Sequence, residues 1–106
     1  MKLISRDELK DKLDRGDSFK LVMVLGEIAF RAKRIPGSIN CSTPAEQEAA
    51  LAKTDEIVVY CASATCPASI LALRMLAARG YENVRRYAGG LDDWESAGYA
   101  LEGELA

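Results

Sequence analysis

Two cysteines, Cys61 and Cys66, mark the part of the chain best suited to chemistry. Cys61 ends a short apolar run, and Cys66 closes a stretch of small or polar residues before Pro67 opens a helical pattern. A thiol at the carboxyl end of a buried strand, facing the amino end of a helix, lies where backbone N–H groups and the helix dipole favour an anion. Such a setting lowers the pKa of a cysteine and produces a thiolate, the nucleophilic form. The sequence therefore predicts a reactive thiol at Cys61.

The chain contains no histidine, so activation of this thiol has to come from the loop backbone, the helix terminus or nearby Arg and Lys side chains. Small residues let a backbone curl closely around a sulfur atom, and inward-pointing N–H groups then hold an anion. This would be nucleophilic catalysis by a thiol that electrostatics, rather than a base, activates. The expected anion-binding loop comprises Ala62, Ser63, Ala64, Thr65 and Cys66.

The elements that must position this loop alternate between helix and strand. Ser5 followed by Glu8, and Thr43 followed by Glu46, have the spacing of helix-capping boxes. We expect helices over residues 5–16, 27–33, 44–52, 67–79 and 91–97, and strands over 20–25, 38–40, 56–60 and 83–87. Alternation of this kind is typical of a parallel sheet with helices on both faces, where ligands bind at the carboxyl ends of strands. Cys61 falls at such an end.

Length and composition narrow the class of protein. With 106 residues, 49% hydrophobic and 28% charged, the chain is expected to form one domain over residues 1–106. The formal net charge of −2 argues against a nucleic-acid or acidic-membrane partner. We find neither a membrane-spanning apolar run nor a signal segment, so we expect a cytoplasmic location. Three cysteines without histidine are too few ligands for a zinc site, so we expect neither metal nor cofactor.

Several short motifs follow one another in a characteristic order along nearly the whole chain. Residues 35–40 read Ile-Pro-Gly-Ser-Ile-Asn, Cys61 joins a strand to a helix, and residues 87–94 contain Gly-Gly followed by Trp94. Together they resemble single-domain rhodanese-like sulfurtransferases. The resemblance implies a three-layer α/β domain with a mostly parallel sheet of about five strands. It also implies that Cys61 takes a sulfane sulfur from a small donor such as thiosulfate, becomes a persulfide, and passes the sulfur to a thiol, a protein cysteine or another nucleophile.

The chain departs from this family at the loop. Family loops often carry a glycine in the middle and an arginine or other polar residue at the sixth position, where this chain has Ala64 and Cys66. Without this arginine, the loop lacks a cation that would help to hold an anionic donor such as thiosulfate. The basic residues before Pro36 have two interpretations, a solvated surface or a means of attracting an anionic donor, with Arg34 as the candidate residue.

A second departure concerns four positions where the family usually has an Asp-x-Arg pair, a glutamate and a histidine. We interpret the change as the replacement of an ion pair by apolar contacts, which can be nearly neutral for stability. The four positions here are Met23, Leu25, Ala29 and Arg34.

Cys66 leaves the function open between alternatives. It is either a small residue before the helix or a resolving thiol that attacks an oxidised or sulfur-loaded Cys61 to form a disulfide. The first function that we expect is sulfur transfer through Cys61. The alternatives are a thiol–disulfide redox or sensor protein that uses both cysteines, and a binding module that has kept the fold without the chemistry.

Overall fold

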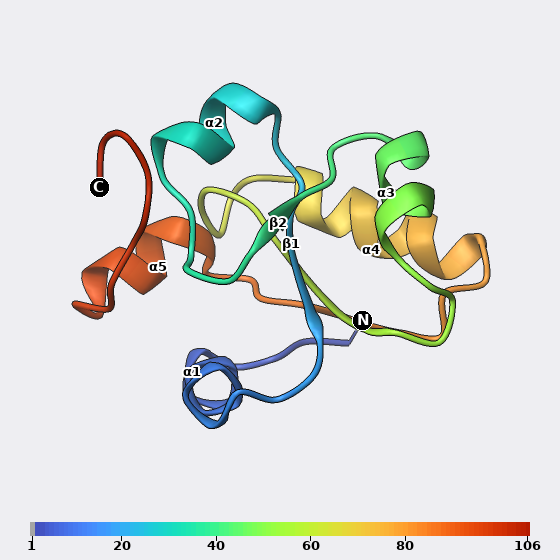
Figure 1. Cartoon of the computed structure of the whole chain (residues 1–106), viewed down its shortest axis with the longest axis horizontal. Helices are drawn as coiled ribbons and strands as arrows, with labels where there is room; N and C mark the ends of the chain where they lie inside the picture. The colour runs from blue at the N-terminus through green and yellow to red at the C-terminus, as the bar shows by residue number, and fades with distance from the viewer. Residues whose placement is uncertain (1) are drawn as a thin grey trace.

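Helices and strands alternate along residues 2–106, the part of the chain that the computed structural model describes (Figure 1). The helices are α1 (Arg6–Arg15), α2 (Glu27–Ala32), α3 (Pro44–Ala50), α4 (Ala68–Ala78) and α5 (Gly90–Ser96). The strands are β1 (Lys20–Met23), β2 (Ile39–Asn40), β3 (Glu56–Tyr60) and β4 (Asn83–Arg86). All pair in parallel in the order β2-β1-β3-β4, which confirms the predicted α/β class.

The sheet has four strands where the sequence predicts about five. Beyond β4, Leu3 forms an isolated parallel bridge with Arg86. The N–H of Ile4 donates to the Arg86 carbonyl at 3.0 Å, and the N–H of Arg86 donates to the Lys2 carbonyl at 3.0 Å. The N-terminal segment therefore extends the edge of the sheet by one bridge, which is too short for a strand of its own.

The helix starts follow the capping residues seen in the sequence. The Ser5 side chain accepts from the N–H of Glu8, and Thr43 forms a complete capping box with Glu46. The second of these helices, α3, ends at Ala50 instead of near residue 52, because the next residue adopts an extended conformation. No helix over residues 2–106 combines the length and the apolar character that crossing a membrane requires.

Helices cover both faces of the sheet and bury two apolar cores. In Figure 1, α3 and α4 lie on one side of the strands, and α1 and α5 lie on the other. Alternate residues of β3 contribute to opposite cores, as the period of a strand requires. Ile57, Val59 and Cys61 pack with α4, whereas Val58 and Tyr60 pack with α1 and α5. Cys61 thus belongs to the face that α4 covers.

The buried side chain of Tyr60 fixes the Ile-Pro-Gly turn next to the site. Its hydroxyl accepts from the N–H of Ile35 at 3.1 Å and lies 2.9 Å from the hydroxyl of Ser38. The turn is closed by a bond of 3.1 Å from the Ser38 N–H to the Ile35 carbonyl. Gly37 has a φ of +86°, a conformation that favours glycine. The sequence motif therefore has a structural role, anchored from the strand that carries Cys61.

Three of the four positions that depart from the family pattern lie in or against an apolar core. Met23 is fully buried, and Leu25 and Ala29 pack against the same core. Apolar packing is therefore found at these three positions, whereas Arg34, the fourth, is paired with Glu102.

Candidate active site

Cys61 lies directly after β3 and is 1% exposed. Its Sγ is 3.5 Å from the Cys66 carbonyl oxygen, 3.5 Å from Ser69 Oγ and 4.0 Å from the Ser63 carbonyl oxygen. The loop of residues 62–66 and the first turn of α4 therefore enclose the sulfur. The position at the carboxyl end of a central parallel strand is the one that the sequence predicts.

The start of α5 supports this loop from the other side. The N–H groups of Leu91 and Asp92 donate to the carbonyls of Cys61 and Ala62 at 3.0 and 2.9 Å. Gly90 has a φ of +66°, and a Cβ added there would lie 2.4 Å from the Cys61 carbonyl oxygen. The Gly-Gly segment is needed because the two backbones approach too closely for a side chain.

The donors of the loop are arranged differently from the predicted cradle. The Cys66 N–H donates to the Ser63 carbonyl at 3.2 Å and closes a turn. The hydroxyls of Ser63 and Thr65 lie 3.2 Å apart at the surface, bonded to each other. The backbone N–H groups of Ala62 and Ala68 lower the pKa of Cys66. These donors therefore favour an anion at Cys66, whereas the sequence predicts a cradle for Cys61.

The acidities of the two thiols follow from this arrangement. Burial and the neighbouring Cys66 raise the pKa of Cys61, although the hydroxyl and N–H of Ser69 act in the opposite sense. Burial also raises the pKa of Cys66, but hydrogen bonds from the Cys61 thiol and from two backbone N–H groups, with the charge of Arg86, lower it overall. The prediction of a lowered pKa at Cys61 is therefore wrong for the unmodified pair. The directions of the two pKa shifts favour the thiolate at Cys66 over the thiolate at Cys61.

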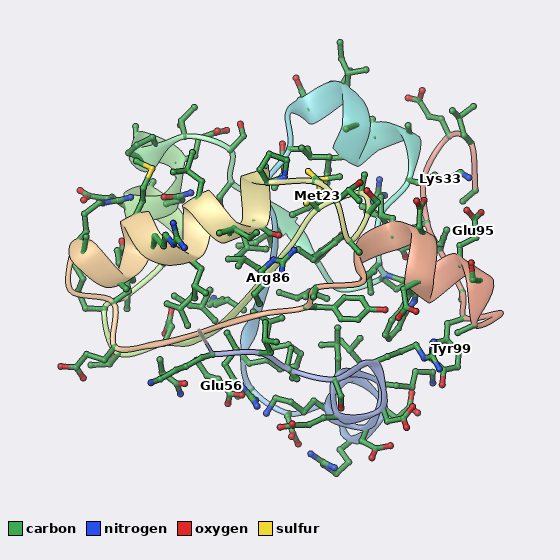
Figure 2. The ribbon with its side chains drawn as sticks, turned by 180° about the vertical axis from the view of Figure 1, so that it is seen from behind. Met23, Lys33, Glu56, Arg86, Glu95 and Tyr99 are labelled. Atoms are coloured by element: carbon green, nitrogen blue, oxygen red, sulfur yellow. The ribbon has the colours of Figure 1, made fainter. Side chains whose placement is uncertain are left out.

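Arg86 and Ser69 are site residues that the sequence reasoning missed. Arg86 Nε donates to Ser69 Oγ at 2.8 Å, and this hydroxyl also contacts Cys61. Figure 2 shows Arg86 in the interior of the molecule, beside the N-terminal end of α4. Strand alternation indicated that only one of Arg85 and Arg86 faces any given site. The available signal was that Arg86 has the same parity as the apolar Val84, on the face that α4 covers.

Arg34, the candidate for attracting a donor, is engaged elsewhere. Its guanidinium lies 3.6 Å from a carboxylate oxygen of Glu102, donates to the Phe30 carbonyl at 3.3 Å and stacks over the Phe30 ring. Its backbone forms an antiparallel bridge with Glu102. These contacts give Arg34 a role in holding the C-terminal segment, and its charge is compensated.

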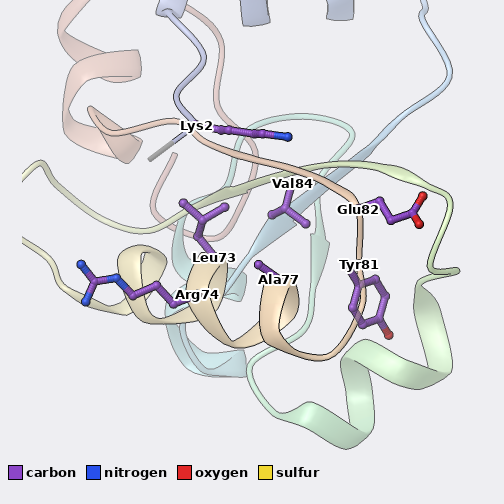
Figure 3. A pocket seen from close by; sticks show the side chains of 7 residues that line it. All are labelled: Lys2, Leu73, Arg74, Ala77, Tyr81, Glu82 and Val84. Carbon is purple, nitrogen blue, oxygen red and sulfur yellow. The ribbon is translucent and has the colours of Figure 1, made fainter.

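Two surface hollows differ in their relation to the sulfur atoms. A shallow hollow of about 460 Å³ lies over the loop and α5 and is lined by Ser63, Ala64, Thr65, Gly89, Asp92, Asp93 and Ser96. No basic side chain is among the lining residues. A groove of about 350 Å³ lies along α4 and β4, with Leu73, Tyr81 and Val84 in its wall (Figure 3). Neither set of lining residues includes a cysteine, but the hollow over the loop is lined by three residues of the segment between Cys61 and Cys66 and is therefore the one next to the site.

Within residues 2–106, no group of three or more Cys, Asp or Glu side chains is arranged to hold a metal ion. The side chains that the structure brings together around Cys61 are Ser69 and, through it, Arg86. Cys41, the third cysteine, is buried in the core next to α4.

Comparisons with known proteins agree with the fold. The model of a family described as the rhodanese-like domain matches residues 5–97. The structure of BH2092 from Bacillus halodurans superimposes with a TM-score of 0.90 at 22% identity, covering 98% of this chain and 78% of that one. Alr3790 from Anabaena gives 0.82 at 26% identity, covering 97% and 94%. The human single domain sulfurtransferase TSTD1 gives 0.76 at 24% identity, covering 91% and 96%. A comparison with curated protein sequences gave no match.

Proposed function

Because the chain belongs to the rhodanese-like domain family, we propose that it is a sulfurtransferase that carries sulfane sulfur as a persulfide on Cys61. The observation that carries the proposal is the placement of Cys61 at the carboxyl end of β3, enclosed by a short loop and the start of α4. The structurally similar human protein is described as a single domain sulfurtransferase, which is consistent with this assignment.

The loading step needs a Cys61 thiolate. The lowered pKa of Cys66 makes its thiolate available as the base in a chain without histidine, and Cys66 is a neighbour of Cys61, whose Sγ lies 3.5 Å from the Cys66 carbonyl oxygen. The Cys61 sulfur then attacks the outer sulfur of a donor such as thiosulfate. A new S–S bond forms to Cys61, the S–S bond of the donor breaks, and sulfite leaves with the electron pair. Cys61 now carries a persulfide.

The unloading step regenerates Cys61. A thiolate of the acceptor attacks the outer sulfur of the persulfide, a new S–S bond forms on the acceptor, and Cys61 leaves as a thiolate. The acceptor is a small thiol or a cysteine of a partner protein. Because Asp92 and Asp93 line the hollow beside the loop and no basic side chain does, we expect a donor of lower charge than the thiosulfate dianion, such as an organic trisulfide or a monoanionic persulfide, to load Cys61 more readily.

Steady-state sulfur transfer to cyanide or to a thiol tests the proposal. Cys61→Ser should lower kcat/KM by at least about a hundredfold, since it removes the nucleophile. Cys41→Ala is the matched control, because it removes a cysteine that lies outside the site. Equal activity of Cys61→Ser and wild type would contradict the assignment. The absence of any transfer by wild type across several donors would favour a binding module.

One observation favours a second candidate function, that of a thiol–disulfide redox protein. Cys61 Sγ lies 3.5 Å from the backbone carbonyl oxygen of Cys66, so the two cysteines are neighbours at the ends of one short loop. A two-electron oxidant such as a peroxide would convert one of the two thiols to a sulfenic acid, and the other, as a thiolate, would attack its sulfur and displace hydroxide to give a disulfide. Peptide mapping after mild peroxide treatment should then find a reversible Cys61–Cys66 disulfide. Over-oxidation of a single cysteine without a disulfide would exclude this function.

A further inference from the structure

Arg86 is a buried cation on β4, and its side chain contacts Ser69 at the start of α4, next to the loop. It is 6% exposed and pairs in register with Val59 of β3, two residues before Cys61. Its backbone is held on the outer side by Lys2 and Ile4. The strand position of the side chain is therefore fixed by the sheet on both sides.

No carboxylate lies within ion-pairing distance of this guanidinium in the described part of the chain. Its bonded side-chain partner is the hydroxyl of Ser69, at 2.8 Å. Arg85, the next residue back, shows the usual arrangement, since it faces outward and pairs with Glu8 at 2.8 Å and Glu56 at 3.4 Å. A buried charge without a counter-ion is costly. An anion formed in the site would compensate the charge of Arg86.

Ser69 connects this charge to the sulfur. In the neutral pair, the Cys61 thiol donates to Ser69 Oγ at 3.5 Å. A hydroxyl can rotate its hydrogen. Once Cys61 is an anion, the Ser69 hydroxyl can donate to the sulfur while it still accepts from Arg86 Nε. The charge of Arg86 also favours the thiolate of Cys66.

We propose that Arg86 is a positioning residue that supplies the positive charge for the anionic forms of Cys61, acting through the hydroxyl of Ser69. The arginine that family loops often carry at the sixth position is absent here, and Arg86 provides a cation from β4 instead. The proposal deepens the sulfurtransferase assignment and rests on it for the identity of the sulfur anion as a persulfide. The other charged groups near the loop are the carboxylates of Asp92 and Asp93, which line the outer hollow.

The pH dependence of Cys61 alkylation, read by peptide mass, tests this role without any sulfur donor. The measurement uses the full chain with Cys66→Ser, so that Cys61 titrates without a coupled thiol. Arg86→Gln and Ser69→Ala should each raise the midpoint by about one unit and slow alkylation at neutral pH about tenfold. Arg86→Lys keeps the charge and should recover part of the shift. Arg85→Gln removes the same charge from the outward face of the strand and should leave the midpoint unchanged.

A double variant tests whether Arg86 and Ser69 act on Cys61 through one connection. Arg86→Gln with Ser69→Ala should shift the midpoint no further than either change alone, because both interrupt one connection. A midpoint equal to that of the parent in both Arg86→Gln and Ser69→Ala would overturn the proposal. If Arg86→Gln fails to fold, an unchanged midpoint in Ser69→Ala alone is enough to overturn it. Failure of the wild-type chain to accept sulfur would contradict the sulfurtransferase assignment, whereas the midpoints decide separately on Arg86.

Discussion

Cys61 and Cys66 differ in the two properties that govern how fast a thiol reacts, exposure and acidity. Cys61 is 1% exposed, while Cys66 is only partly buried. The pKa of Cys61 is raised by burial and by Cys66, and the pKa of Cys66 is lowered by its hydrogen bonds and by Arg86 in spite of its burial. The thiolate form is therefore favoured at Cys66, whereas Cys61 is protected from bulk solvent.

This division predicts the order in which the thiols are modified. A lowered pKa means that the Cys66 thiolate persists below the ordinary thiol range, so at neutral pH iodoacetamide should label Cys66 at least about tenfold faster than Cys61. Peptide mass mapping at short times measures both sites in one sample. Buried Cys41, whose pKa is raised mainly by burial, serves as the internal slow reference. Faster labelling of Cys61 would show that the loop is arranged differently in solution.

The loop depends on two elements that meet behind it, the end of β3 and the start of α5. Gly90 allows this contact, because a Cβ there would lie 2.4 Å from the Cys61 carbonyl oxygen. Without the close approach, the N–H groups of Leu91 and Asp92 could not bind the carbonyls that begin the loop. The position of Cys61 thus depends on Gly90, which is distant from it in the sequence.

Gly90→Ala should destabilise the fold more than a positive φ alone explains. Gly16 provides the matched control, since its φ is +70° and nothing lies within 4 Å of an added Cβ. Gly16→Ala should cost about 1–2 kcal/mol, and Gly90→Ala about 1–3 kcal/mol beyond that because of the added clash. Urea unfolding measures both free energies. Equal losses in the two variants would mean that the contact behind the loop is not tight.

The elements were more predictable than the interior of the site. Helix starts such as Thr43 and the strand end at Cys61 follow from local chemistry, namely capping side chains and an apolar run that stops at a polar loop. The orientation of loop N–H groups depends on tertiary contacts with α5, which no local pattern contains. Arg86 was missed because strand alternation limits an arginine pair to one residue per face, and choosing Arg86 needed the further step of placing the apolar Val84, which has the same parity, on the face of the site.

At the scale of the whole molecule, the surface hollow beside the Cys61–Cys66 loop carries negative charge. The formal net charge is −2, and Asp92 and Asp93 line the hollow over the loop. Asp93 is paired with Arg6 at 3.0 Å, whereas α5 itself contains no basic residue beside Asp92. The buried Arg86 attracts an anion only over a short range. The negative surface therefore disfavours the approach of a dianionic donor such as thiosulfate, although the buried charge of Arg86 favours an anion next to Cys61.

This charge distribution predicts an unusual salt dependence of loading by thiosulfate. Raising the ionic strength from about 0.01 M to about 0.15 M shortens the Debye length from roughly 30 Å to roughly 8 Å. Repulsion at the entrance is then screened, so the loading rate should rise severalfold. An uncharged organic trisulfide should show little change, and Asp92→Asn should flatten the dependence for thiosulfate. A rate that falls with salt would indicate that attraction by cations dominates the entrance.

The most direct test of the account is the intact mass of the chain after incubation with a sulfane sulfur donor and removal of excess reagent. We expect wild type to gain the mass of one sulfur atom, mapped to Cys61, and to lose it when cyanide or a thiol acceptor is added. Cys61→Ser should gain none, and Cys41→Ala should behave as wild type. A chain that gains no sulfur, or that carries the sulfur equally well without Cys61, would contradict the proposed function.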